Sequence, residues 1–225
     1  MSTVELCRET TSKLRRYAAM LGEANARARV TGPSDPEILF SEHIADALEG
    51  LRFFAGYGSF ADVGTGGGLP GLVLAICRPD ASVCLIDSVA KKIDIVRGLA
   101  EGLNCQNVSA VNARSEDFAM TNREAFDAAT ARAVADSRVL AEYLSPLVRV
   151  GGRLIAFKGP KASDEIRLPE RMWRILGLSK PELHPYSIAG RQRCLVIWEK
   201  TGACDRRFPR RPGLAEKQPW CGRRR

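Results

Sequence analysis

The chain has 225 residues and a mass of 24.6 kDa, and its 45% hydrophobic and 27% charged residues are ordinary for a globular protein with one α/β domain and additions. No apolar run approaches the ~18 residues that cross a bilayer, and the first residues lack the apolar stretch of a secretory signal, so we expect a cytoplasmic protein without membrane attachment. Seven cysteines without a Cys-x-x-Cys pair, beside only two histidines, argue against a metal site and against disulfides.

Most of the net charge of +8 lies near one end of the chain. Residues 201–225 contain eight Arg or Lys against two Asp or Glu, a local net charge of +6. This asymmetry predicts a basic arm for a polyanion, with phosphate as the expected target. A solvated tail that only aids solubility is the alternative. We therefore divide the chain into a helical extension (1–56), an α/β domain (57–200) and a basic arm (201–225).

Two helices are predicted before the first strand. Between residues 4 and 24, apolar side chains recur near one helix face, at Leu6, Leu14, Tyr17 and Leu21. Turn residues follow at 31–36, after which Asp35 can cap a second helix that begins at Pro36 and runs to about Gly56.

From residue 60 onward, short β-rich runs alternate with helical ones. Strands are predicted at about 60–63, 83–87, 107–112, 126–131 and 153–158, and helices near 70–78, 89–102, 136–147 and 162–177. Repeated βα units predict a mostly parallel sheet covered by helices on both faces. Residues 181–200 resemble two strands joined by an Ala-Gly turn, so a sheet of seven strands should end in an antiparallel strand.

The stretch ADVGTGGGLPG at 61–71 has two interpretations. Gly64-x-Gly66-x-Gly68 suits a methyl-donor site, whereas Gly66-x-Gly68-x-x-Gly71 also fits the dinucleotide pattern of an NAD-dependent oxidoreductase. A tight structural turn is a third possibility. The predicted closing hairpin favours the methyl donor, because a dinucleotide-binding sheet is normally parallel throughout and methyltransferases that use S-adenosylmethionine have the antiparallel variation.

Polar residues that could bind a nucleoside follow the next two strands. Asp87 ends the second strand, nineteen residues after Gly68, where a carboxylate can accept hydrogen bonds from ribose hydroxyls, and Ser88 could share that contact. Ser115 and Glu116 follow the third strand, where the adenine-binding edge of a doubly wound sheet would lie. Alternatively, they cap a short helix.

An ordered set of motifs identifies a family resemblance. DVGTGGGLPG, LIDSVAKK, ARSEDF, ARAVA, FKG and RRFPRRPG occur in the order seen in the bacterial 16S ribosomal RNA guanine-N7 methyltransferases, also called the glucose-inhibited division protein B family. This resemblance implies a Rossmann-like methyltransferase domain and S-adenosylmethionine-dependent methylation of guanine N7 in small-subunit rRNA near the decoding site. It places cofactor contacts on Gly64, Leu69, Ser115, Glu116 and Arg132, with Asp87 as the ribose acid.

Four further residues are candidates for catalysis, for RNA binding or for the entrance that RNA would use. Arg132 lies at the carboxyl end of the fourth predicted strand, where it could hold cofactor and RNA or pair with Asp136. Lys158 ends the fifth strand and could contact a phosphate or the base. His43 and Asp46, three apart on a helix, could line the RNA entrance or bond each other.

The chemistry of guanine N7 needs little from the protein. N7 carries an in-plane lone pair and no proton, so it can attack the sulfonium methyl directly without a general base, and alignment could supply up to ~7–11 kcal/mol. The chain has neither the Asn/Asp-Pro-Pro-aromatic loop of amino-group methylation nor the Pro-Cys of cytosine C5 methylation. Lys158 leaves ribose 2′-O methylation as an open alternative.

The basic arm is predicted to bind the phosphates of RNA. Exposed phosphate contacts are expected from Arg206, Arg207, Arg210 and Arg211, and deletion of 206–225 is expected to weaken RNA binding without changing cofactor affinity. The expected partner is 16S rRNA in the small subunit or its precursor, and a monomer is expected. The alternatives are an NAD-dependent oxidoreductase and a non-catalytic RNA-binding protein that keeps a nucleoside pocket.

Overall fold

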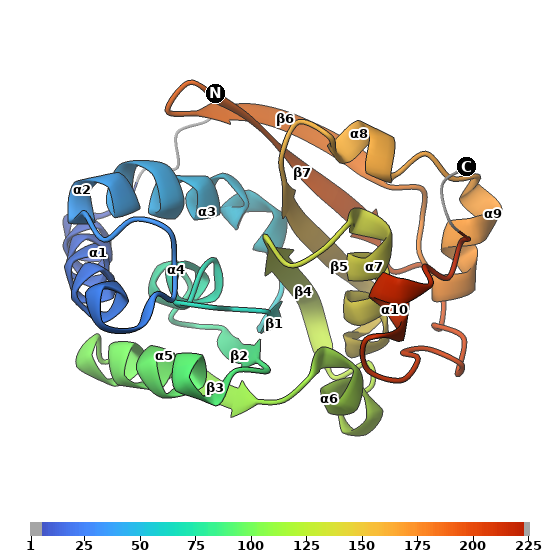
Figure 1. Ribbon diagram of the computed structural model, residues 1–225, viewed down its shortest axis with the longest axis horizontal. Coiled ribbons are helices and arrows are strands. Elements are labelled where there is room, and N and C mark those ends of the chain that lie inside the picture. The colour runs from blue at the N-terminus through green and yellow to red at the C-terminus, as the bar shows by residue number, and fades with distance from the viewer. Residues whose placement is uncertain (1–5, 223–225) are drawn as a thin grey trace.

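A computed structural model describes residues 6–222, and its centre is a seven-stranded sheet in the order β3-β2-β1-β4-β5-β7-β6 (Figure 1). Neighbours among the first five strands pair in parallel, whereas β7 is antiparallel to both β5 and β6. The predicted α/β fold with an antiparallel last strand is therefore confirmed. The strands are β1 Ser59–Val63, β2 Ser82–Asp87, β3 Val108–Asn112, β4 Phe126–Arg132, β5 Val148–Lys158, β6 Glu182–Ile188 and β7 Arg191–Glu199.

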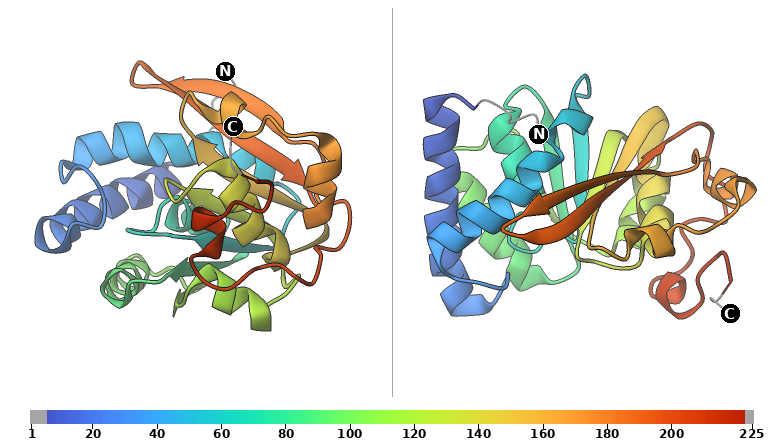
Figure 2. Two further views of the ribbon diagram at one scale, coloured as in Figure 1. Left: turned by 45° about the vertical axis from the view of Figure 1, so that its right-hand side comes forward. Right: turned by 90° about the horizontal axis from the view of Figure 1, so that it is seen from above.

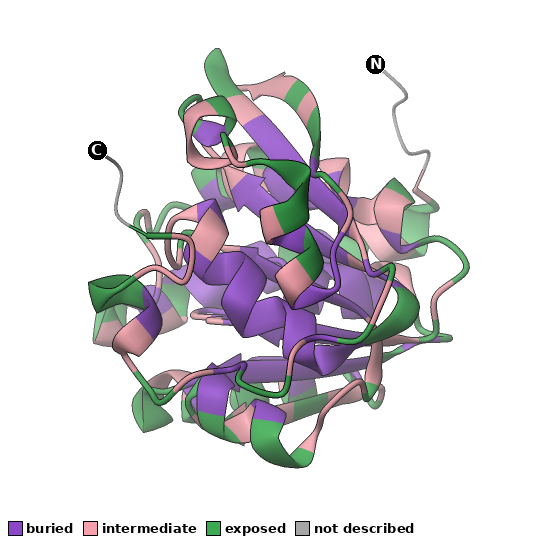
Figure 3. Cartoon of the chain, turned by 90° about the vertical axis from the view of Figure 1, so that its right-hand side faces the viewer, coloured by how far each residue is buried: buried purple, intermediate pink, exposed green. Residues whose placement is uncertain are grey.

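Helices cover both faces of the sheet, because alternate strand residues point to opposite sides. In β1, Phe60 joins one core cluster and Ala61 the other. The first cluster is covered by α1 (Arg8–Ala28), α4 (Gly71–Cys77) and α5 (Ala90–Gly102), and the second by α6 (Ser115–Thr121), α7 (Ser137–Leu144), α9 (Glu170–Trp173) and α10 (Leu214–Lys217). Figure 3 shows buried residues concentrated between these layers. Within residues 6–222, no helix combines the length and apolar character needed to cross a membrane.

The second N-terminal helix is not continuous as predicted. Asp35 does cap its start, because its Oδ1 accepts the amide of Glu37 at 2.8 Å. The segment then divides into α2 (Pro36–Ile38), a π-helical turn η1 (Leu39–Ile44), α3 (Ala45–Glu49) and a 3₁₀ turn η2 (Leu51–Phe54). A π turn widens the helix by one residue and changes which side chains face inward beyond it.

The prediction of one helix over 162–177 is wrong. The chain forms α8 (Ala162–Glu165), α9 and a 3₁₀ turn η4 (Arg174–Leu176), with Pro169 between the first two. Proline lacks the amide that an α-helix needs and disfavours helical backbone in the residue before it, so the helix ends and restarts there.

Two other boundaries differ from expectation. Strand β5 begins at Val148 rather than 153. A short helix, α6, does begin at Ser115, but its N-cap is Arg114, so Ser115 and Glu116 lie in its first turn and do not cap it. Residues 4 and 5 of the first predicted helix lie outside the described residues, as do the last three arginines of the basic arm.

Residues 201–222, called here the C-terminal segment, pack against the face of the sheet that carries α7. Phe208 and Ala215 are buried in the second core cluster, and Trp220 stacks edge to face against Trp173. Figures 1 and 2 show α10 beside α7, in agreement with their contact. The segment is thus part of the folded domain, although much of its backbone is irregular.

Candidate functional site

The candidate site lies at the carboxyl ends of the parallel strands. The strand order reverses between β1 and β4, and ligands of open α/β sheets bind in the crevice that such a reversal creates. Two cavities meet there and share Gly64. The large cavity, about 620 Å³, is bounded by the N-terminal helical extension and the ends of β1, β4 and β5, whereas the small cavity, about 80 Å³, lies at the ends of β1, β2 and β3 beside α7 and α10.

The glycine loop passes between the cavities in a conformation that larger residues could not adopt. Gly64 has a φ of 71°, and a Cβ there would overlap the side chain of Val134. Gly66 lines the large cavity and donates its amide to Asp87 Oδ2 at 3.1 Å. From α1, the Tyr17 hydroxyl donates to the carbonyl of Gly67 at 2.9 Å and holds the loop from the other side.

The remaining glycines of the motif have packing roles. A Cβ on Gly68 would lie 2.6 Å from Leu72 Cδ1, and one on Gly71 would overlap Leu85. Neither glycine lines the large or the small cavity, although Leu69 between them lines the large one. Helix and strand packing therefore accounts for the dinucleotide spacing, and Gly68 is the one predicted cofactor glycine that faces the core.

Asp62 is a buried acid under the loop that the sequence reasoning missed. Its Oδ2 accepts hydrogen bonds from the Thr65 hydroxyl at 2.7 Å and the Gly71 amide at 2.9 Å, whereas its Oδ1 has no partner among the described atoms. Burial raises the pKa of this carboxyl to about 6. An acid inside the apolar strand FADV was the available signal.

Asp87 occupies the position expected for a ribose acid. It is buried at the end of β2, and its two oxygens accept the amides of Gly66 and Val89 at 3.1 and 3.0 Å. Each carboxylate oxygen can accept a second hydrogen bond, so capacity for two hydroxyl donors remains. Ser88 is exposed and lines the small cavity. Lys92 places its Nζ 3.9 Å from Asp87 and lines the large cavity.

Ser115 and Glu116 line the small cavity from the first turn of α6, and both are buried. The Ser115 hydroxyl lies 3.0 Å from Glu116 Oε2, and Glu116 Oε1 accepts the backbone amide of Gly213 at 2.9 Å. Tyr143 of α7 and Glu216 of α10 also line this cavity, with the Tyr143 hydroxyl donating to Glu216 Oε1 at 3.3 Å. Sequence reasoning missed both of these residues.

Arg132 connects the sheet to the N-terminal helices beside the large cavity. Its NH1 bonds Asp46 Oδ2 at 3.1 Å, and its NH2 lies 3.2 Å from His43 Nδ1. Asp46 also accepts the Tyr186 hydroxyl at 2.7 Å. Burial, followed by the charge of Arg132, lowers the pKa of His43. Because arginine only donates, Nδ1 must be the acceptor, which leaves the proton of the neutral ring on Nε2.

The partners proposed from sequence for these residues need correction. Asp136 pairs with Arg138 at 2.8 Å and not with Arg132. His43 and Asp46 are brought together by Arg132 and do not depend on a bond to each other. The carbonyl of His43, in the π turn, also accepts from Arg132 at 3.4 Å, so the irregular helix supplies part of this network.

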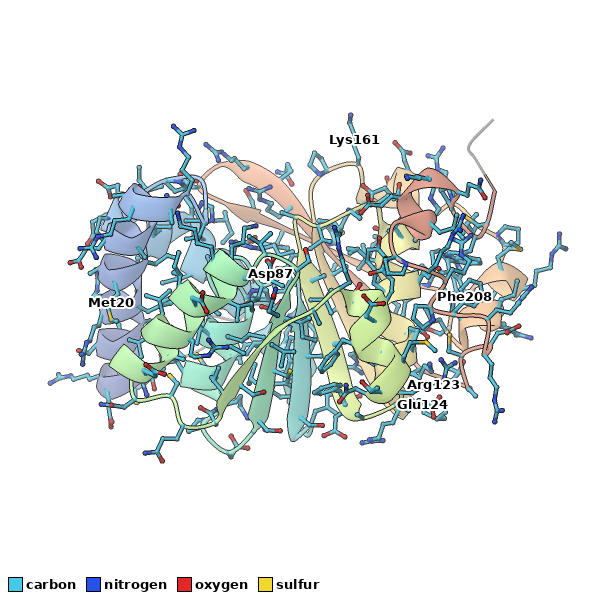
Figure 4. The ribbon with its side chains drawn as sticks, turned by 60° about the horizontal axis from the view of Figure 1, so that its bottom comes forward. Met20, Asp87, Arg123, Glu124, Lys161 and Phe208 are labelled. Carbon is cyan, nitrogen blue, oxygen red and sulfur yellow. The ribbon has the colours of Figure 1, made fainter. Side chains whose placement is uncertain are left out.

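Lys158 lines the large cavity with its ammonium already engaged. Its Nζ donates to the carbonyl of Ala135 at 2.6 Å and forms an ion pair with Glu165 at 2.8 Å. Four other cations line this cavity: Lys92 and Arg132, described above, Arg193, and the exposed Lys161, which projects outward in Figure 4. Among residues 6–222 there is no cluster of His, Cys, Asp and Glu that could hold a metal ion.

The four arginines of the basic arm that the structure describes separate into two kinds. Arg206, Arg207 and Arg211 are exposed, and Arg207 pairs with Asp205 at 3.1 Å. Arg210 makes a two-pronged ion pair with Glu142, at 2.8 and 2.6 Å, and the Glu142 side chain is fully buried. Arg210 is therefore an anchor of the C-terminal segment, and the other three have side chains exposed to solvent.

Solved structures with the same fold include methyltransferases. The O-methyltransferase TomG of Streptomyces achromogenes, in complex with SAM, matches with a TM-score of 0.58 and 14% identity over 89% of this chain and 93% of its own. A 16S rRNA adenine-N1 methyltransferase of Catenulisporales acidiphilia, with SAM, matches with a TM-score of 0.53 and 15% identity over 72% and 93%. These similarities confirm the predicted Rossmann-like methyltransferase fold.

Sequence comparison identifies the family. A ribosomal RNA small subunit methyltransferase G of Rubrobacter xylanophilus is 42% identical over 97% of this chain and 87% of its own length. One of Desulfitobacterium hafniense is 34% identical over 96% and 92%. The model of the family described as rRNA small subunit methyltransferase G matches residues 10–194. The resemblance stated from the sequence motifs is thus confirmed, and the chain belongs to the rRNA small subunit methyltransferase G family.

Proposed function

We propose that the protein transfers a methyl group from S-adenosylmethionine to N7 of a guanine in 16S rRNA, near the decoding site of the small subunit. The observation that carries this proposal is the pair of cavities that share Gly64. The small cavity has carboxylates, those of Asp87 and Glu116, that can bind a nucleoside. The large cavity has space for a base beside several cations. Membership of the rRNA methyltransferase family supports the reaction class.

The residues present fit S-adenosylmethionine. Asp87 has acceptor capacity for two ribose hydroxyls, with Ser88 next to it at the small cavity, and Glu116 with Ser115 lies where the adenine would be held. Gly64, Gly66 and Leu69 line the path toward the large cavity. A pyrophosphate site built on Gly68 and Gly71 has no support, because both glycines pack against the core.

S-adenosylmethionine, when bound, supplies a methyl group on a positively charged sulfur. Guanine N7 has a lone pair and no proton, so its attack on that methyl would form a C–N bond while the C–S bond pair would go to sulfur and neutralise its charge, and no residue would have to accept a proton. The protein has to orient the two reactants and exclude other attacking groups, and it does not have to move a proton.

Arg132 and Lys158 serve this reaction mainly by position. Arg132 holds Asp46 and His43 against the end of β4, which fixes the wall of the cavity that receives the base. The ammonium of Lys158 is engaged by Glu165 and a carbonyl, which argues against its use as a base for ribose 2′-O methylation. His43 presents a neutral ring at the same cavity, where RNA would enter.

RNA binding would use exposed cations that contact phosphate. Arg206, Arg207 and Arg211 of the C-terminal segment and Lys161 at the large cavity have the required exposure. Arg210 contributes indirectly, because it fixes the segment that carries them. The substrate is 16S rRNA in the small subunit or its precursor, and the enzyme acts in the cytoplasm as a monomer.

Methyl transfer to defined substrates tests the proposal. The protein is incubated with labelled S-adenosylmethionine and small subunits, precursor particles or naked 16S rRNA that lack the modification. Primer extension after N7-specific cleavage should then show one new stop at a guanine. Absence of transfer to all three substrates by a protein that binds the cofactor would leave a non-catalytic RNA-binding protein. Transfer to a ribose oxygen or an amino group would overturn the N7 assignment.

A further inference from the structure

We propose that the C-terminal segment is one wall of the cofactor site and that Glu216 binds the adenine of the cofactor, selecting its amino group. This inference rests on the proposed use of S-adenosylmethionine. It concerns residues beyond the part of the chain that the family model matches, which ends at residue 194.

Two hydrogen bonds join the segment to residues of the small cavity. The Gly213 amide donates to Glu116 Oε1 at 2.9 Å, and the Tyr143 hydroxyl donates to Glu216 Oε1 at 3.3 Å. Glu116, Tyr143 and Glu216 all line that cavity. The segment is therefore bonded to cavity residues on two neighbouring helices, α6 and α7. It also supplies the Glu216 side chain, which lines the cavity.

Several contacts hold this wall in place. Arg210 pairs with the fully buried Glu142, and Arg123 donates to the carbonyls of Phe208 and Cys204, both at 2.6 Å. Phe208 is itself buried, and Figure 4 shows it on the same side of the molecule as Arg123. The indole of Trp220 donates to a carbonyl of α7 at 2.8 Å, beyond α10 in the chain. With anchors on both sides of Glu216, the position of its backbone is fixed by the fold.

The chemistry of the small cavity distinguishes between nucleosides. Glu116 and Glu216 can only accept hydrogen bonds while ionised, and Tyr143 directs its proton to Glu216. Apolar side chains of Ile86 and Val134 line the same cavity and suit the faces of a purine ring. An exocyclic amino group offers two donors to these acceptors, whereas a carbonyl oxygen at the same position would face lone pairs. The cavity thus favours adenine over hypoxanthine.

The same segment carries the exposed arginines proposed to contact RNA. The expectation that removal of 206–225 leaves cofactor affinity unchanged is therefore not supported by the contacts. Loss of the segment removes Glu216 and also the amide that holds Glu116. Cofactor and RNA sites share this part of the chain.

Calorimetric titration of the full-length protein with S-adenosylhomocysteine and with its inosine analogue tests the role of Glu216. The wild type should bind the adenosine compound more tightly. Glu216→Ala should weaken that binding about 5- to 10-fold, with a smaller change for the inosine analogue, so the preference falls. Glu216→Gln should lie between, since its carbonyl oxygen can still accept. Lys217→Ala, on the adjacent exposed residue, is the matched control and should bind as the wild type does.

Equal loss of affinity for both compounds, or no loss, would overturn the contact between Glu216 and the amino group.

A second pair of variants tests whether the C-terminal segment is a wall of the cofactor site. Removal of 213–225 should weaken S-adenosylhomocysteine binding by at least about 10-fold, whereas removal of 223–225 should not. Thermal unfolding checks that both remain folded, and unchanged affinity in a folded 213–225 deletion would overturn the wall. Failure of the wild type to bind S-adenosylhomocysteine would instead overturn the proposed cofactor.

Discussion

The two cavities on either side of Gly64 are built on different principles. At the large cavity, the two cations at the ends of β4 and β5 are already paired with carboxylates, Arg132 with Asp46 and Lys158 with Glu165. At the small cavity, the carboxylates of Asp87 and Glu116 accept backbone amides and keep capacity for further donors. The first cavity thus has a wall of side chains that bond one another, and the second has acceptors that remain available to a ligand.

This difference explains what each side can select. A wall of mutually paired charges fixes the shape of the cavity and so the orientation of a large substrate. Removal of one partner leaves the other charge buried and unpaired, which destabilises the wall. Available acceptors instead choose a ligand by its donors, because a ligand without them leaves a polar group unpaired. Substitutions of Arg132 and Asp87 test this contrast directly, and substitutions of Arg210 and Asp62 test how buried charges outside the cavities are held. They follow in order of decreasing expected effect.

Arg132→Ala should abolish most methyl transfer while the small cavity stays intact. The substitution leaves Asp46 buried without its cation and loosens the wall that orients the base, so we expect a loss of roughly 10³-fold, or about 4 kcal/mol of transition-state stabilisation. Single-turnover methyl transfer measures it. Arg174→Ala, which breaks an exposed pair with Glu170, serves as control. Transfer within threefold of the wild type would contradict the role given to this wall.

Arg210→Met should destabilise the domain by about 3 kcal/mol, because it strands the buried carboxylate of Glu142. The Tm should fall by roughly 10 °C in a chain of this size. Arg207→Met, beside an exposed partner, should change the Tm little. Combining Arg210→Met with Glu142→Leu should recover much of the loss, and no recovery would show that the pair is not the source.

Asp62→Asn should change how stability depends on pH. The folded-state pKa of about 6 lies above the unfolded value of 3.8, so the contribution of the protonated acid is fully present below pH 3.8 and is lost as the pH rises through 6. The variant should therefore gain about 2–3 kcal/mol of unfolding free energy relative to the wild type between pH 4 and 7. Urea unfolding at several pH values measures this difference, and a constant difference would contradict it.

Asp87→Ala should weaken S-adenosylhomocysteine binding about 20-fold, or about 2 kcal/mol, by removing the acceptor for ribose hydroxyls. Asp94→Ala, on the exposed surface of α5, is the control. Methyl transfer at saturating cofactor should recover much of its rate in Asp87→Ala. If the rate did not recover, Asp87 would affect methyl transfer as well as cofactor binding, which would contradict the separation of roles between the two cavities.

Many residues at the candidate site could be predicted from the positions where the strands end. Periodicity located β2, β3, β4 and β5 well enough to bring Asp87, Ser115, Arg132 and Lys158 to one edge of the sheet, because the carboxyl ends of parallel strands lie together. The residues that they bond could not be predicted in the same way. Tyr186 and Asp46 are 140 residues apart, and no local pattern encodes such a contact.

The errors have local causes that the sequence partly reveals. Pro169 marks the break inside the helix predicted over 162–177, because proline interrupts a continuous α-helix. The role of the C-terminal segment was hidden because its charge suggested solvent exposure, whereas Phe208, Ala215 and Trp220 fix it to the core. In the sequence, Arg210 looks like the arginines beside it. Only its ion pair with the buried Glu142 distinguishes it.

The π turn of Leu39–Ile44 has a consequence for how this chain can vary. Such a turn contains one residue more than a regular α-helical path, and the extra residue places the His43 carbonyl and the Asp46 carboxylate together against Arg132. Loss of a single residue here would rotate every later side chain of the helix by about 100°. We therefore expect this stretch to tolerate exchanges of side chains far better than changes of length.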